Sequence, residues 1–146
     1  PRFIWDEEDG VATCILTDGH NTFIGEAICH DKDMDMKSEK TGCEIAAKRA
    51  LLQYLTHIRD NELKPQLKAL KQLYYNMSHS QHFNEKSYEN KMLQRHIHMT
   101  MDDLATIKEE IATTKQELID YIAKKEEFYQ HTRDRRLEKE LEDKNK

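Results

Sequence analysis

Glycine and proline, the residues that most often interrupt regular structure, are scarce in this chain, with 4 and 2 among 146 residues. Cysteine is scarce too: Cys14, Cys29 and Cys43 are an odd number and form no CxxC pair. No stretch of about 20 apolar residues occurs, and the start of the chain lacks the apolar core of a secretion signal. We therefore expect a protein of the reducing cytosol, without membrane spans, whose thiols are small buried hydrophobes.

An excess of positive charge is also missing. The 23 Lys and Arg residues are outnumbered by 28 Asp and Glu, for a formal net charge of −5, which argues against nonspecific coating of DNA. A small anion in a local basic pocket is still allowed. Charged residues make up 35% and apolar residues 37%, a balance typical of long amphipathic helices with solvated outer faces.

Signatures of catalysis are absent. The chain has no glycine-rich phosphate loop and no serine bracketed by glycines. His30 follows Cys29 directly, but adjacent residues of a strand face opposite sides, so this pair is poorly placed to share a proton. We therefore expect a binding protein and not an enzyme.

Two groups of residues resemble metal sites only in part. Asp31, Asp33 and Asp35 have the spacing of a calcium loop, but Met36 takes its glycine slot and Gly42 the slot of its bidentate carboxylate. The histidines of the second half of the chain lack the carboxylate or thiolate that would complete a zinc site; they are His79, His82, His96 and His98. We expect no metal and no cofactor.

The most regular feature is a seven-residue apolar ladder in the second half of the chain. Its two series of heptad positions are Ile97, Leu104, Ile111 and Leu118, and Leu93, Thr100, Ile107, Thr114 and Tyr121. Such a ladder needs another helix to cover it, which is typical of a coiled coil. The pattern therefore favours an assembly of helices and an oligomer.

The first forty residues predict a small β-rich head. Residues 11–17 and 22–29 flank the segment Asp18-Gly19-His20-Asn21, which supplies the Gly and Asn that tolerate the positive φ of a tight turn. Both faces of this hairpin carry apolar residues: Val11, Ile15, Ile24 and Ile28 on one, and Cys14, Leu16 and Phe23 on the other. A lone hairpin is marginal in water, so we expect it to pack on a helix. The run 3–5 is either an edge strand or an arm that docks on a partner.

Two long helices are expected next. Thr41 and Glu44 have capping-box spacing, so a helix should begin near residue 42, and its apolar stripe reaches about residue 77 with a kink near Asn61 caused by Pro65. Residues 78–84 break the pattern, and Asn84 or Ser87 can cap a second helix from about 85 to 129. The charged segment 133–146 is expected to fray.

These elements predict an α+β protein. A small N-terminal antiparallel β-hairpin or sheet head (1–40) is followed by a long helical hairpin, or coiled coil, that mediates oligomerisation (41–132) and by a charged C-terminal tail (133–146).

One segment has the chemistry of a ligand platform at the start of the second long helix. It combines an aromatic face, amides and cations close to a helix N-terminus, which favours anions; its residues are His82, Phe83, Asn84, Tyr88, Asn90, Lys91 and Arg95. Composition alone favours a purely structural interpretation, in which Phe83 and Tyr88 staple the helix bend and the cations are solvated. Lys48, Arg49, His57 and Arg59 form a smaller basic cluster on the first helix.

Three segments of the chain resemble the first-described phage anti-defence family that acts against the Thoeris system. They are residues 17–27 (TDGHNTFIGEA), 35–46 (DMKSEKTGCEIA) and 61–67 (NELKPQL) followed by a long helix, and the likeness covers about residues 11–130. The resemblance implies a phage protein in the cytoplasm of the infected bacterial host. There it would disarm immunity by binding a signal without cleaving it.

The resemblance also implies a ligand and an assembly. A TIR-domain enzyme of Thoeris converts NAD into a cyclic ADP-ribose isomer, and family members sequester this signal; some also hold cyclic oligonucleotides at a second site. We expect glycocyclic ADP-ribose (gcADPR) as the ligand and a homo-oligomer, either a dimer or a hexamer. By chemical role, Phe83 would stack on the base, Asn84 and Asn90 would make polar contacts, and Lys91 and Arg95 would bind phosphate. The alternatives are a structural or adaptor coiled coil without a small ligand, and an enzyme that degrades the signal.

Overall fold

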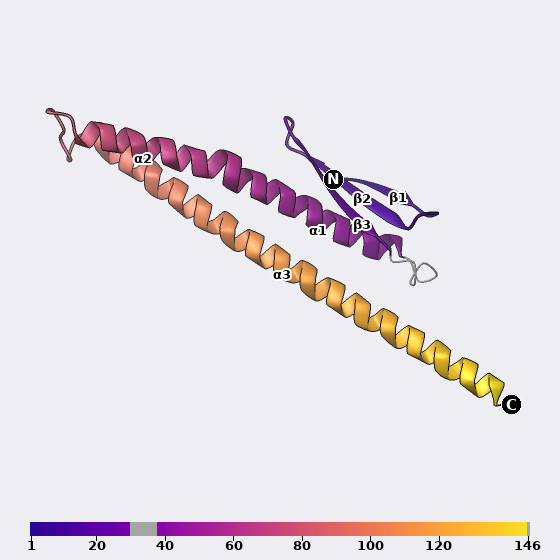
Figure 1. Cartoon of the computed structure of the whole chain (residues 1–146). Coiled ribbons are helices and arrows are strands. Elements are labelled where there is room, and N and C mark those ends of the chain that lie inside the picture. The colour runs from indigo at the N-terminus through magenta and orange to yellow at the C-terminus, as the bar shows by residue number, and fades with distance from the viewer. Residues whose placement is uncertain (30–37, 146) are drawn as a thin grey trace. The chain divides into compact units, whose positions relative to one another are not determined.

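The computed structural model describes residues 1–29 and 38–145 and has a three-stranded antiparallel sheet and long helices (Figure 1). The strands are β1 (Arg2–Asp6), β2 (Val11–Thr17) and β3 (Thr22–Ile28). The helices are α1 (Glu39–His57), the π-helical turn η2 (Ile58–Leu63), α2 (Lys64–Ser78) and α3 (Tyr88–Lys144). The expectation of an α+β protein is confirmed. Asp31, Asp33 and Asp35, whose spacing resembles a calcium loop only in part, lie outside the described residues.

The chain divides into two compact units. The first comprises Pro1–Gln53 and Thr114–Lys146, and the second comprises Tyr54–Thr113. The sheet and most of α1 belong to the first unit, whereas η2, α2 and the first part of α3 belong to the second. Among the described residues, none of the helices is both long enough and apolar enough to cross a membrane.

The sheet of the first unit is a meander with strand order β1-β2-β3. The predicted hairpin is confirmed as β2 and β3, which pair from Val11↔Ile28 to Thr17↔Thr22. Asp18 accepts the backbone amides of His20 and Asn21 at 2.9 and 2.7 Å, and Gly19 has φ +95°. The expectation of a positive φ at Asn21 is wrong, because the Asp18 carboxylate already closes the turn. Residues 2–6 form an edge strand, as one of the two expectations had it.

One face of the sheet packs on α1 through small side chains. The core is formed by Ala12 and Cys14 of β2, Ala27 of β3, and Ala46 and Ala50 of α1. Gly25 lies at the closest approach, since a β carbon there would collide with the backbone of Ala46 and Ala50. On the opposite, outer face, Ile24 and Ile28 of β3 are 47% and 71% exposed, and Ile15 of β2 is half-buried. Only one of the two apolar faces is therefore buried against α1, because only the face lined by small residues lets a helix approach.

The start of α1 differs from the expectation. The helix begins at Glu39, and the Ser38 hydroxyl accepts the amide of Thr41 at 3.3 Å. The capping-box interpretation of Thr41 and Glu44 is therefore wrong: both residues lie inside the helix, and a serine three residues earlier provides the cap.

The expected kink near Asn61 takes the form of the π-helical turn η2. The amide of Lys64 donates to the carbonyl of Arg59, five residues back, and Pro65 stands in the first turn of α2. A proline ring would clash with the carbonyl four residues earlier in a regular helix, and a wider turn removes that clash. One continuous α-helix over 42–77 is therefore replaced by two helices with a π turn between them.

In the second unit, α2 and the first part of α3 lie antiparallel and are joined by residues 79–87 (Figure 1). The Gln66 side chain on α2 donates to the Thr100 hydroxyl on α3 at 3.4 Å. Helix α3 begins at Tyr88, three residues later than expected, and Ser87 caps it by accepting the amide of Asn90 at 3.2 Å. It runs to Lys144, so the expectation that residues 133–144 fray is wrong.

Five of the nine residues of the heptad ladder are buried in the single chain, and the other four, Ile97, Ile107, Leu118 and Tyr121, are half-buried. Its most buried members are Leu93, Thr100, Leu104, Ile111 and Thr114, each at most 9% exposed. The ladder does need a covering helix, as its pattern indicates, but the chain covers it without a second copy. Oligomerisation therefore does not follow from the ladder.

Candidate functional site

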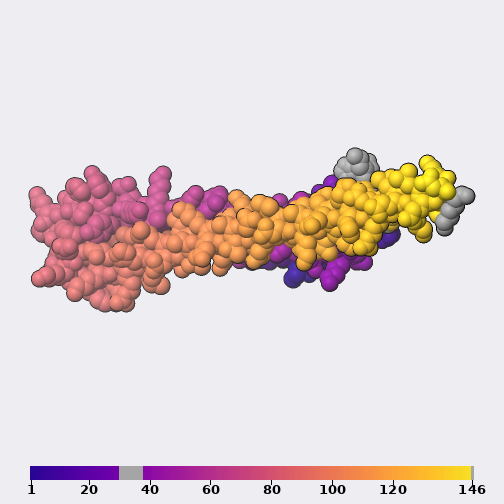
Figure 2. Space-filling model, turned by 90° about the horizontal axis from the view of Figure 1, so that it is seen from below, coloured from indigo at the N-terminus to yellow at the C-terminus, as the bar shows by residue number. Residues whose placement is uncertain are grey.

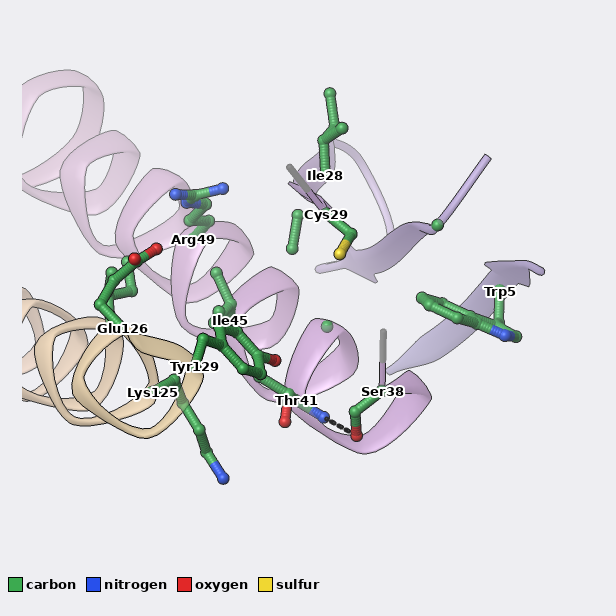
Figure 3. Close-up of a pocket in the computed structure, with 14 residues that line it drawn as sticks. Trp5, Ile28, Cys29, Ser38, Thr41, Ile45, Arg49, Lys125, Glu126 and Tyr129 are labelled. Carbon is green, nitrogen blue, oxygen red and sulfur yellow. Dashed lines mark hydrogen bonds between the residues drawn. The ribbon is translucent and has the colours of Figure 1, made fainter. Parts of the chain in front are cut away.

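A cavity of about 200 Å³ lies in the first unit, between the sheet, α1 and the later part of α3 (Figure 3). The strands contribute Trp5, Ala27 and Ile28, helix α1 contributes Thr41, Gly42, Ile45 and Arg49, and α3 contributes Ile122, Lys125, Glu126 and Tyr129; Gly10, Cys29 and Ser38 complete the lining. The cavity thus brings together residues from the two ends of the chain.

Local structure positions the groups at the mouth of this cavity. The indole Nε1 of Trp5 donates to Glu7 Oε2 at 2.6 Å, which fixes the ring beside Gly42 of α1. Arg49 donates from Nη1 to the carbonyl of Glu26 at 2.7 Å, which ties its guanidinium to the edge of β3. The Lys125 ammonium lies 5.5 Å from the centre of the Tyr121 ring, within reach of a cation–π interaction.

Tyr121 joins α3 to α1 at the base of this region. Burial, and then a hydrogen bond to the Glu44 carboxylate, raise the pKa of its hydroxyl, while a hydrogen bond with Thr41 acts in the opposite direction. Lys48 of α1 also bridges Glu117 of α3 at 3.2 Å. Helix α3 is therefore held against α1 by polar contacts as well as by the ladder.

The cavity combines aromatic rings, cations and hydroxyls. Trp5 and Tyr129 offer π faces, Arg49 and Lys125 offer positive charge, Ser38 and Thr41 offer hydroxyls, and Glu126 adds one carboxylate. Rings bind bases by stacking, and cations bind phosphates by charge-assisted hydrogen bonds. This set of groups suits a small anionic ligand with a planar base.

The buried thiols near the cavity are poor nucleophiles. Burial raises the pKa of Cys14 and of Cys43, so that less thiolate is present at neutral pH. Cys14 is fully buried, and all three cysteines are free. The expectation that the thiols are small buried hydrophobes is confirmed for Cys14; Cys29 and Cys43 are half-buried.

The platform predicted from the sequence lies in the second unit. Phe83 is half-buried, and its ring meets that of Tyr74 edge to face at a centroid distance of 6.2 Å. Asn84 accepts the amide of Lys86 at 3.0 Å and shapes the turn before α3. Tyr88 is 73% exposed, and Lys91 and Arg95 are exposed. These contacts agree with a stapling role for Phe83, and a role in ligand binding stays a prediction.

Asn90 is the predicted site residue with the most unusual surroundings. It is fully buried, and its Nδ2 donates to the carbonyl of Glu85 at 2.9 Å. Its Oδ1 is buried and has no hydrogen-bond partner among the described residues. Leaving such an oxygen unpaired costs about 1–3 kcal/mol, so a polar group that reaches Asn90 would be stabilising.

No family model, no curated protein and no solved structure matches this chain.

Sequence reasoning missed most of the cavity. The sequence places Arg49 in a basic cluster on the first helix but associates Trp5, Lys125 and Tyr129 with no site. They are separated from Arg49 by long stretches of chain, and no motif joins them. An available signal was the run of Ile122, Lys125 and Tyr129, which continues the ladder face of α3 with a cation and a ring.

Proposed function

We propose that this protein binds and sequesters gcADPR and thereby protects a phage from Thoeris immunity in the cytoplasm of the infected bacterial host. The likeness of residues 17–27, 35–46 and 61–67 to the anti-defence family supports the ligand and the biological role. The observation that carries the binding function is the cavity that presents Trp5, Tyr129, Arg49 and Lys125 together.

The size of the cavity indicates how the ligand would lie. Pockets that bury a whole drug-sized molecule have about 300–1,000 Å³. At about 200 Å³, this cavity has room for a base and its ribose, with Trp5 or Tyr129 as the stacking face. The phosphates would then lie at the open side, within the field of Arg49 and Lys125. Stacking contributes about 1–3 kcal/mol per base, and the charged hydrogen bonds add to it.

A protein that only sequesters gcADPR releases it unchanged, whereas an enzyme would release an altered nucleotide. The purified protein is incubated with gcADPR, freed of excess nucleotide and heated, and the released material is examined by liquid chromatography and mass spectrometry. Intact gcADPR in the supernatant supports sequestration, and an altered nucleotide would show the competing function, degradation. Recovery of no nucleotide, together with no rise in melting temperature for any cyclic nucleotide, favours the structural or adaptor coiled coil.

Matched variants separate the cavity from the predicted platform. Lys125→Ala should weaken binding of gcADPR about tenfold or more, because the variant loses a charged contact with phosphate. A tenfold weaker affinity corresponds to a loss of about 1.4 kcal/mol of binding free energy. Lys124→Ala is the control, since Lys124 is exposed and does not line the cavity. Tyr129→Leu and Phe128→Leu form a second such pair. If Phe83→Ala abolishes binding while both cavity variants bind normally, the ligand belongs to the platform.

The assembly belongs to the same proposal. A homo-oligomer, either a dimer or a hexamer, would carry several gcADPR sites in one assembly. A second kind of site would add cyclic oligonucleotides to its ligands. Native mass spectrometry with gcADPR and with a cyclic trinucleotide counts subunits and ligands in one measurement. One observation favours the structural alternative: the buried residues of the ladder give the helices a packing role that needs no ligand.

A further inference from the structure

Helix α2 carries a local basic surface on a chain that is acidic as a whole. Residues 63–84 contain no Asp or Glu, although the chain has 28 of them and a formal net charge of −5. The same stretch has three lysines, Lys64, Lys68 and Lys71, and all three are exposed. Positive charge is therefore concentrated on one helix of the second unit.

The three lysines and Tyr75 form one stripe along α2. They follow one another at steps of four, three and four residues, which places them on one face of the helix. Half-buried residues recur with the same steps one position earlier in the chain: Leu63, Leu67, Leu70 and Tyr74. Packing thus covers the apolar series and leaves the basic stripe (Lys64, Lys68, Lys71 and Tyr75) in solvent.

A shallow groove of about 440 Å³ follows this basic stripe. Its lining consists of the four residues of the stripe together with Leu67 and Gln72. The Lys64 ammonium lies 3.3 Å from Asp60 Oδ1, whereas Lys68 and Lys71 have no acidic partner in the part of the chain that the structure describes. At least two of the three ammonium groups are therefore available to an anion.

The basic stripe ends in two neighbouring rings. Tyr75 is 58% exposed, and its ring centroid lies 4.2 Å from that of His79, with 35° between the planes. His79 Nδ1 donates to the carbonyl of Tyr75 at 2.8 Å, which holds the imidazole beside the phenol ring. A ring that is held in place and remains more than half exposed suits stacking by a base.

We infer that the basic stripe binds single-stranded nucleic acid, with its lysines on successive phosphates and a base stacked on Tyr75. The lysines are spaced by about 4.5 and 6 Å along the helix axis, which a flexible single strand can follow. A duplex hides the faces of its bases, so the exposed ring favours an unpaired strand.

Other polyanions fit the basic stripe less well. An acidic peptide would use the lysines but would leave the ring without a role. An anionic membrane requires an apolar face beside the cations, and the one aliphatic residue of the groove, Leu67, is half-buried. The groove shares no residue with the lining of the cavity in the first unit, so this inference is independent of the proposed function.

The role of the lysines is tested by salt dependence. Fluorescence anisotropy of a labelled oligothymidine with the full chain should give an affinity that falls with salt at a log–log slope of about −2, as expected for three phosphates of a single strand. Lys68→Gln should make this slope shallower by roughly 0.7 and weaken binding about threefold or more at low salt. Circular dichroism checks that the variant is folded.

Lys108→Gln is the matched control for the lysine variant. Lys108 is an exposed lysine of the same unit, on α3, and is followed by Glu109 and Glu110. Its replacement changes the net charge by the same amount and should alter neither the slope nor the affinity. Equal effects of the two variants would overturn the inference, and so would the absence of any anisotropy change for wild-type protein at low salt.

The role of the ring is tested separately. Tyr75→Leu should weaken binding of oligothymidine about fivefold or more and leave the salt slope unchanged, because a stacking contact is lost and no charge is removed. Phe128→Leu replaces a ring that is 60% exposed in the first unit and should have no effect. Unlabelled duplex, polyglutamate and phosphatidylserine vesicles should each compete less well than unlabelled oligothymidine. Equal or better competition by any of them would overturn the assignment to a single strand.

Discussion

At the residue scale, the contact between the sheet and α1 depends on glycine at position 25. A β carbon at Gly25 would run into the backbone of Ala46 and Ala50, and backbone atoms cannot turn aside as a side chain can. At Gly42 the added carbon would meet Ala12 Cβ at 2.9 Å and Trp5 Cζ3 at 3.2 Å, so the overlap is smaller than at Gly25, but Ala12 can give way only together with its strand. The two glycines of one interface therefore differ in what they tolerate.

We expect Gly25→Ala to lower the free energy of unfolding by about 3 kcal/mol, the upper end of the range for overpacking. Gly42→Ala is the matched comparison and should lower it by less than Gly25→Ala, because the overlap is smaller and the gain in helix propensity, about 1 kcal/mol, offsets part of it. Urea denaturation followed by circular dichroism measures both. Equal effects would mean that α1 moves away from the sheet more easily than its backbone contacts suggest.

Among the described residues of the second unit, Asp60 is the one whose pKa is lowered most. Arg59 donates to both carboxylate oxygens at 2.8 and 3.1 Å, and Lys64 approaches at 3.3 Å. The hydrogen bonds from Arg59, followed by the smaller contribution of Lys64, lower the pKa of Asp60 from 3.8 to about 2. The carboxylate is exposed, so its contribution to stability is small and is best seen by titration.

A lowered pKa in the folded state stabilises the fold above the unfolded value, and this stabilisation is lost as the pH falls. For Asp60 the loss should occur between about pH 4 and pH 2. Carbon-detected NMR of the side-chain carboxyl should show a midpoint near 2, and Arg59→Gln should raise it toward the ordinary value. A midpoint near 3.8 in the wild type would show that the ion pair does not persist in solution.

At the element scale, α3 depends on a single residue for its start. Ser87 accepts the amide of Asn90 with its hydroxyl and the amide of Lys91 with its carbonyl, at 3.2 and 3.0 Å. Asn84 acts one turn earlier, on Lys86. Of the two caps that the sequence allows, Ser87 is therefore the one that ends the loop.

Ser87→Ala should cost about 1 kcal/mol of stability, because an amide of the first turn loses its acceptor. Ser87→Asp should keep the stability, since a carboxylate accepts the same amide and favours the positive end of the helix. Thermal unfolding of the three proteins at one pH gives the comparison. Equal stability of the alanine variant would mean that another group satisfies the amide.

At the scale of the whole molecule, the end of α3 extends beyond the contacts that stabilise the first unit. Residues 134–145 are all exposed, including Leu137 and Leu141 at 57% and 61%. Figure 2 shows these last turns of α3 in yellow. The segment is helical without being buried, as its alternating charges allow.

Deletion of residues 137–146 should therefore change the free energy of unfolding by less than about 0.5 kcal/mol, as is usual for exposed positions. Binding of gcADPR should also be unchanged, because Lys125 and Tyr129 lie before the deletion. Denaturant unfolding and calorimetric titration check the two statements. A large loss of stability would assign the segment a contact with another copy of the chain.

Local patterns were enough to predict the hairpin, the turn at Asp18 and Gly19, the presence of two long helical stretches and the buried ladder. Each of these depends on residues a few positions apart, whose preferences are set by backbone sterics and by periodic burial. Helix ends were less well predicted, because the choice of Ser38 over Thr41 as a cap depends on where the preceding chain leaves the sheet. The C-terminal end of α3, in the charged segment, was also poorly predicted.

Tertiary structure decided which apolar face of the hairpin is buried, where the ladder finds its covering helix, and which groups share the cavity. Gly25 and the alanines opposite it are unremarkable in sequence, but only in contact do they let a helix approach the sheet. Trp5 and Tyr129 lie at opposite ends of the chain, and no local pattern could bring them together. Long-range packing therefore assembled the candidate site, since its members have no shared sequence periodicity by which to recognise it.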